Sequence, residues 1–298
     1  MSETKTDLSL EEKADFTVAD KTTLVDQKAI MNSFISTRMR MHHDSVEDAK
    51  ATYEREARYF KRLVSASTKL KTATGLSLCS VFFEVAITGL SLQPGGKADA
   101  FIESRGTKTG EKRDNKDVYI EIASLSVSAY GELNMRIKAG QIIRMSNPIV
   151  LYEKDHFQPM TTGRGELTID YKAEIPRTSN TIVGVWCAVY LPHNGIDFKW
   201  LLEADIKRLM EYSIPKYQGA TANKLYTSNN GQIDTGFLEA KCIKHAMRAY
   251  TKLKVSDNIQ FEKSVDDIES EENGFAEKEE IKPVVVIEEE KEEDNGGF

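Results

Sequence analysis

Apolar residues recur at helical spacing in two long stretches of the first third of the chain. In "DSVEDAKATYEREARYFKRLVSAST", Asp44 or Ser45 is placed to cap a helix whose core face would hold Tyr53, Ala57, Phe60 and Val64. The stretch "GLSLCSVFFEVAITGLSLQPGG" is the most apolar of the chain and predicts a buried helix. That helix should end at Gly89, before the Pro94-Gly95-Gly96 turn.

Alternating patterns dominate the middle of the chain. "ADAFIESRGTKTGEKRDNKDVYIEIAS" predicts two strands joined by a long polar turn, and a helix should follow over about residues 124–139. Residues 141–155, 165–175 and 181–192 resemble strands, and residues 195–213 should change from strand to helix near Glu203. A turn-rich connector then precedes a last helix over 236–254. The order predicts an α+β fold in which N-terminal helices and a basic C-terminal core helix pack on a central antiparallel meander or hairpin.

Both ends differ in composition from this core. We expect residues 1–40 to form a mostly disordered N-terminal arm in which Phe16 and Leu24 are candidates to dock. Residues 41–255 would be the folded core, and residues 256–298 an acidic disordered tail. No apolar run is long enough to span a bilayer, and Cys79, Cys187 and Cys242 lie far apart in apolar stretches. These features predict buried reduced thiols in a cytoplasmic protein.

The net charge of −7 hides an uneven distribution. Residues 256–298 contain 16 acids and 4 bases, whereas residues 27–255 contain 24 acids and 33 bases. A basic body between acidic ends indicates a polyanionic partner for that body.

Two clusters carry most of the candidate chemistry. On the last helix, cations at i, i+3, i+7 and i+11 would line one face: Lys241, Lys244, Arg248 and Lys252. At the tip of the hairpin lies a second set: Arg105, Lys108, Lys112, Arg113 and Lys116. Both are predicted to bind a polyanion.

Catalytic signatures are weaker. The chain has no Gly-x-x-x-x-Gly-Lys-Ser/Thr run, so any activity should be independent of ATP, and no cofactor is expected beyond a divalent cation with a modulatory role. Asp234, Glu239 and Lys241 resemble a nuclease set, which leaves a metal-dependent nuclease as an alternative. In nucleases, however, the Glu-x-Lys pair usually lies on strands, whereas Glu239 opens a predicted helix.

Four segments, in order, resemble the RecT-type phage single-strand annealing proteins, relatives of lambda Red beta. They are "SVFFEVAITGLSLQPGGKADAFI", "YIEIASLSVSAYGELNMRIKAGQI", "VWCAVYLPHNGIDFKWLLEADIKRL" and "EAKCIKHAMRAYTKL". The chain departs from the family at Tyr130, where a basic residue is common, and at Phe237, where tryptophan is favoured.

The resemblance implies a non-enzymatic recombination protein that anneals single-stranded DNA without ATP, as a homo-oligomeric ring or filament in the bacterial cytoplasm. DNA, including the annealed duplex intermediate, would lie along a basic groove near the hairpin and the last helix. A phage exonuclease and the host single-strand-binding protein are implied partners. Tyr130, Tyr217 and Tyr226 are candidates to stack on bases. A self-assembling scaffold indifferent to DNA is a further alternative.

Overall fold

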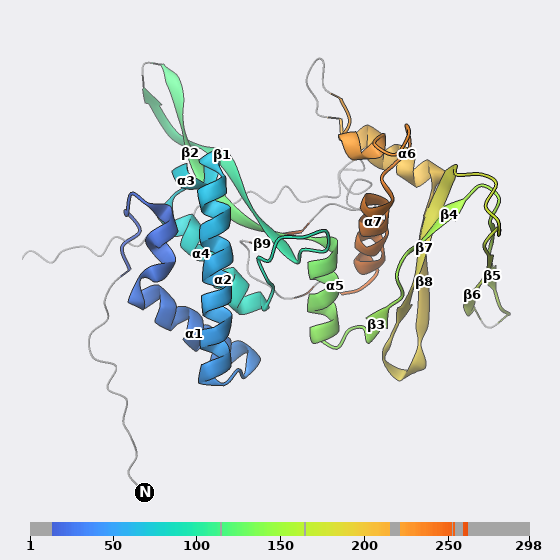
Figure 1. The fold of residues 1–298 in the computed structure, drawn as a ribbon, viewed down its shortest axis with the longest axis horizontal. Helices are drawn as coiled ribbons and strands as arrows, with labels where there is room; N and C mark the ends of the chain where they lie inside the picture. The colour runs from blue at the N-terminus through green and yellow to red at the C-terminus, as the bar shows by residue number, and fades with distance from the viewer. Residues whose placement is uncertain are drawn as a thin grey trace, which may run out of the picture.

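The computed structural model describes residues 14–113, 115–163, 165–214, 221–251, 253 and 259–261. The fold is α+β, as the sequence predicts. Two hydrophobic cores lie side by side, with helix α5 (Ala129–Lys138) between them, as Figure 1 shows. Apart from residues 259–261, the predicted acidic tail lies outside the described residues, as do residues 1–13.

The first lobe is a helical layer packed on one end of a long hairpin. Its helical elements are η1 (Lys21–Asp26), α1 (Lys28–His42), α2 (Val46–Ala66), α3 (Thr68–Thr72) and α4 (Gly75–Thr88). Ser45 caps α2 by accepting a hydrogen bond from the Asp48 backbone N–H, and the predicted core face of α2 is buried. Leu24 is fully buried and Phe16 packs against the same core, so the predicted docking of both residues is confirmed.

The expectation of a mostly disordered arm over residues 1–40 is wrong for the part that the structure describes. Residues 28–42 form α1, which buries Ile30, Phe34 and Ile35 against the first core. The Phe34 ring lies 4.6 Å from the Phe82 ring, centroid to centroid. Apolar burial of this kind stabilises a helix that its weak sequence pattern does not reveal.

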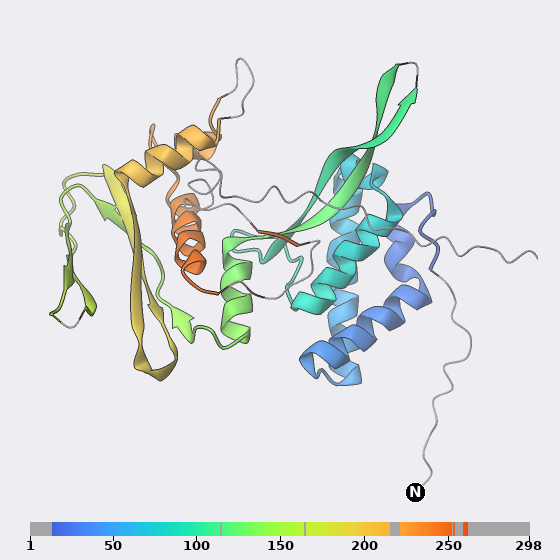
Figure 2. The same cartoon turned by 180° about the vertical axis from the view of Figure 1, so that it is seen from behind.

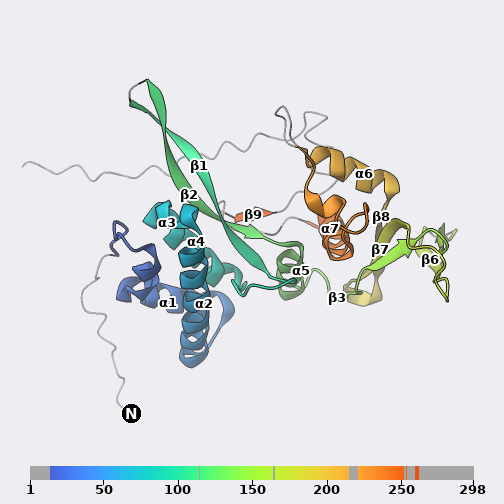
Figure 3. The ribbon, with the colours of Figure 1, turned by 45° about the horizontal axis from the view of Figure 1, so that its top comes forward.

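The hairpin consists of β1 (Ala100–Arg113) and β2 (Lys116–Val127), which pair antiparallel from Ala100↔Val127 to Arg113↔Lys116. Its base covers α4, and its distal half projects from the body (Figures 1 and 3). A short strand, β9 (Ile259–Phe261), pairs parallel with β2, which corrects the prediction of a tail without structure at these three residues. Because β2 extends to Val127, α5 begins at Ala129, after the Ser128 cap, rather than at the predicted residue 124.

The second lobe is a sheet covered on one face by a helix. The elements of its main sheet are β3 (Arg144–Met145), β4 (Ile149–Tyr152), β7 (Ile182–Tyr190) and β8 (Ile196–Leu202). Val185, Cys187 and Val189 alternate along β7 and face α7 (Thr235–Arg248), as expected for a strand with one buried face. The remaining elements are the β5–β6 hairpin (His156–Thr161, Leu167–Lys172), α6 (Glu203–Tyr212), η2 (Pro192–Asn194) and η3 (Lys224–Tyr226). Figure 2 shows this arrangement from behind.

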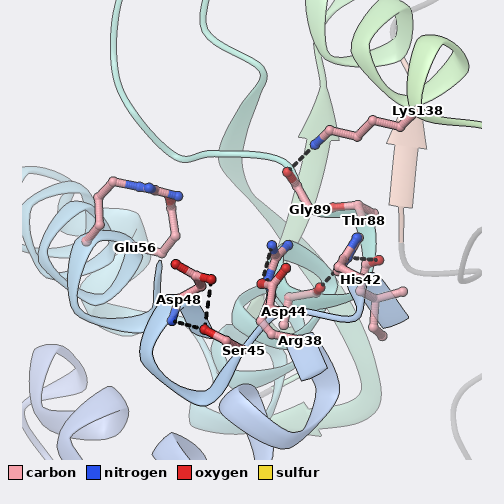
Figure 4. Close-up of polar contacts among 12 residues, drawn as sticks. Arg38, His42, Asp44, Ser45, Asp48, Glu56, Thr88, Gly89 and Lys138 are labelled. Carbon is pink, nitrogen blue, oxygen red and sulfur yellow. Dashed lines mark hydrogen bonds and ion pairs between the residues drawn. The ribbon is translucent and has the colours of Figure 1, made fainter. Parts of the chain in front are cut away.

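The C-terminal end of α4 joins elements of both halves of the molecule (Figure 4). His42 Nε2 lies 3.0 Å from the carbonyl oxygens of both Ala86 and Ile87, and Lys138 of α5 donates to the Gly89 carbonyl at 2.7 Å. Gly89 has φ +69°, so the predicted glycine stop is confirmed. Carbonyls left unpaired at the helix end are thus bonded by side chains from α1 and α5.

Candidate nucleic-acid interface

Helix α7 does not present the predicted row of four exposed cations. It packs against β7 and β8 on one side and α5 on the other, so the Lys244 side chain is buried and forms an ion pair with Glu132 of α5. Lys241 and Arg248 are half-buried, and the Lys241 ammonium lies 4.9 Å from the centre of the Phe237 ring. The helix ends at Arg248, so the predicted extension to residue 254 is wrong, and Lys252 lies outside the described residues.

Glu132 is shared by two cations in the buried α5–α7 contact. Its second carboxylate oxygen accepts from Arg136 at 2.7 Å, and Arg136 also donates to Gln141 Oε1 at 2.7 Å and to the Thr251 carbonyl at 2.9 Å. A buried carboxylate without a partner would be costly, and here both its oxygens are bonded. Lys244 therefore stabilises the contact between α5 and α7, and its buried side chain is not accessible to DNA.

The hairpin does expose its cations. Arg105, Lys108, Lys112, Arg113 and Lys116 are all exposed. Lys108 donates to Asp117 at 2.6 Å, while no ion pair joins the other four to any residue in the described part of the chain. Acids are interspersed with these cations, namely Glu103, Glu111, Asp114 and Asp117, and they dilute the positive charge of the hairpin. That these residues contact DNA remains a prediction.

A basic segment that the sequence analysis did not identify leads to this hairpin. Residues 55–72 contain six bases and one acid, Glu56, which is fully buried and accepts from Arg55 and from the Ser91 hydroxyl. Arg58 and Arg62 are exposed on α2, and Lys69 and Lys71 on α3, which packs against both hairpin strands. Figure 3 shows α2, α3 and the base of the hairpin as neighbours.

We call the nine exposed cations on α2, α3 and the hairpin the basic surface. Its members are Arg58, Arg62, Lys69, Lys71, Arg105, Lys108, Lys112, Arg113 and Lys116. The α2–α3 part could have been found by counting charge over residues 55–72, where helical periodicity directed attention to the core face instead.

Asp234, Glu239 and Lys241 are not brought together as a nuclease set. Asp234 caps α7, accepting from the Phe237 backbone N–H at 2.8 Å. Residues two apart on a helix point in nearly opposite directions, and accordingly Lys241 lies against Phe237 while Glu239 lines a pocket beside Tyr130. Among the described residues, no group of three His, Cys, Asp or Glu side chains is placed to hold a metal ion.

Tyr130 is half-buried at the start of α5, with the Lys97 ammonium 5.6 Å from its ring centre. Burial, together with the negative charge of Glu239, raises the pKa of Tyr130, so its hydroxyl stays protonated. The next residue, Gly131, is so close to the Asp99 backbone that a Cβ would lie 2.0 Å from the carbonyl oxygen. This contact fixes the start of α5 beside the entry to the hairpin. Tyr226 is buried against Phe237 and unavailable for stacking, and Tyr217 lies outside the described residues.

The chain matches no family in a comparison with sequence models of known protein families, and no curated protein resembles it significantly. No helix in the described part of the chain combines the length and apolar character needed to cross a membrane.

Proposed function

We propose that the protein binds single-stranded DNA and anneals complementary strands without ATP, as a homo-oligomeric relative of the RecT-type annealing proteins. The observation that carries the proposal is the basic surface, whose nine cations include only one, Lys108, in an ion pair with another described residue. The four sequence segments that resemble the family support it independently.

Annealing of this kind needs no catalytic group. Lysine and arginine side chains that neutralise phosphates reduce the repulsion between two strands and leave base edges free to pair. A row of cations on each protomer becomes a continuous track when protomers assemble in a ring or filament. The protein would act in the cytoplasm of a bacterial host, with a phage exonuclease and the host single-strand-binding protein as partners.

Two alternative functions, a nuclease and a scaffold, can be distinguished from annealing by experiment. A metal-dependent nuclease would shorten labelled DNA in the presence of magnesium, whereas an annealing protein returns full-length product. A scaffold that assembles without regard to DNA would show no salt-dependent shift of single-stranded DNA in a gel. Glu239 and Lys241 lie on opposite sides of α7, so they are not placed to act together at one metal ion, which counts against the nuclease alternative.

The test removes three charges from the basic surface by Lys112→Gln, Arg113→Gln and Lys116→Gln. The matched control removes three exposed charges from the second lobe by Lys154→Gln, Lys172→Gln and Lys207→Gln. Because each phosphate contact on a single strand contributes roughly 0.7 to the log–log salt slope, the hairpin variant should show a slope shallower by about 2. Its annealing rate at fixed salt should fall by about tenfold, with the control unchanged. Equal behaviour of the two variants would exclude the basic surface as the DNA site.

A further inference from the structure

A small pocket of about 160 Å³ lies where α5, α7 and the β3–β4 loop meet. Its apolar lining consists of Leu133, Met145, Pro148 and Ile243, and Tyr130 also lines it. Pockets for drug-sized ligands are roughly 300–1,000 Å³, so this one accommodates a single planar ring system and little more.

Three polar side chains converge on this pocket without using their hydrogen-bonding capacity on the protein. In the part of the chain that the structure describes, the Glu239 carboxylate and the Asn147 amide have no hydrogen bond or ion pair, and the Lys97 ammonium contacts only the Tyr130 ring. Ser146, in contrast, is engaged, because its hydroxyl accepts from the Ala188 backbone N–H at 2.9 Å. Lys97 and Asn147 are exposed and Glu239 is half-buried, so all three side chains are accessible to a ligand that enters the pocket.

The chemistry of these groups defines the ligand. An aromatic face beside an apolar floor suits a flat heterocycle, and an ammonium at the rim suits a phosphate outside the pocket. A carboxylate only accepts hydrogen bonds, so Glu239 requires an N–H donor, and an exocyclic amino group supplies it. Cytosine, adenine and guanine carry such a group. Thymine does not, and the carbonyl oxygens on either side of its N3–H would face the carboxylate.

The geometry points to a subsite in which each protomer holds one nucleobase of the bound strand on Tyr130 and selects amino-bearing bases through Glu239, while the edges of the other bases stay free to pair. Asn147 would contact the edge of the held base, and Lys97 the adjoining phosphate. This inference rests on the proposed binding of single-stranded DNA. It adds a base preference that a purely phosphate-binding surface does not have, and it gives Glu239 a role as a specificity determinant.

The experiment compares equilibrium binding of equal-length (dC) and (dT) oligonucleotides to the full-length protein and to Glu239→Gln, at one salt concentration. Gln preserves the size of the side chain, and a thermal melt of each protein checks that folding is unchanged. A base-edge contact of this kind should make (dC) bind about fivefold more tightly than (dT), and Glu239→Gln should abolish the difference.

The other possible outcomes separate failure of the subsite from failure of the proposed DNA-binding function. If Glu239→Gln raises the affinity for both oligonucleotides by the same factor, Glu239 merely repels phosphate and the subsite is excluded. If (dC) and (dT) bind equally to both proteins, the subsite is excluded while the DNA-binding function stands. If neither oligonucleotide binds the unmodified protein, the proposed function itself fails.

Discussion

Lys244 of α7 and Glu132 of α5 form an ion pair in which both side chains are buried, 1% and 4% exposed. The two residues are 112 positions apart in the chain. Their pairing joins the helix between the two cores to the helix that covers the sheet of the second lobe. It explains why one lysine of the predicted basic row belongs to the core.

We expect Lys244→Ala to lower the free energy of unfolding by about 3–5 kcal/mol, because Glu132 would keep only one of its two buried cationic partners. Chemical denaturation measures the change. The matched control is Lys207→Ala, which breaks an exposed pair with Glu203 on α6 and should leave stability almost unchanged. Similar losses in both variants would mean that the α5–α7 pair contributes no more than a surface pair.

The sequence predicted those parts of the fold in which local pattern and burial agree. Tyr53, Ala57, Phe60 and Val64 define the core face of α2 in the pattern and in the structure. Periodicity failed for α1, because its apolar residues spread around much of the helix and only Ile30, Phe34 and Ile35 are buried, where α2 and α4 pack against it. Periodicity also assigned the wrong face of α7 to solvent. The spacing of the lysines cannot show that α5 supplies a buried carboxylate, Glu132, to one of them.

The candidate site was predictable to a similar extent. The hairpin cations follow from a polar turn between two alternating strands, and the structure exposes them all. The pocket beside Tyr130 could not be foreseen, since it requires Lys97, Asn147 and Glu239 to meet from three separate segments.

Gly89 should tolerate alanine much less well than Gly140, although both have φ +69°. A Cβ at residue 89 would lie 2.8 Å from His42 Cε1 and 3.0 Å from an Arg38 nitrogen, whereas one at residue 140 meets nothing within 4 Å. The left-handed conformation alone costs alanine about 1–2 kcal/mol, which Gly140→Ala measures. Gly89→Ala should lose at least about 1 kcal/mol more in free energy of unfolding. Equal losses would show that His42 and Arg38 move aside freely.

Stability should fall as the solution is acidified through the range in which histidine titrates. Burial, reinforced by the nearby Arg38 guanidinium, lowers the pKa of His42 from its ordinary 6.5. The unfolded chain therefore binds the proton more readily, so His42 contributes its full stabilisation above about pH 6.5 and loses it progressively below. Denaturation midpoints at a series of pH values should show a slope that His42→Gln reduces, and an unchanged slope would contradict this assignment.

The three thiols should be inert in the folded protein. Cys79, Cys187 and Cys242 are free and buried, as the sequence predicts, and the Sγ atoms of the last two lie 3.7 Å apart. Burial raises the pKa of Cys79 to about 12. A hydrogen bond to Cys187, together with burial, raises the pKa of Cys242. Because the thiolate is the reactive form, a disulfide reagent at about pH 8 should label no cysteine before denaturation and all three afterwards. Rapid labelling of any cysteine in the native protein would show that the core around it opens readily.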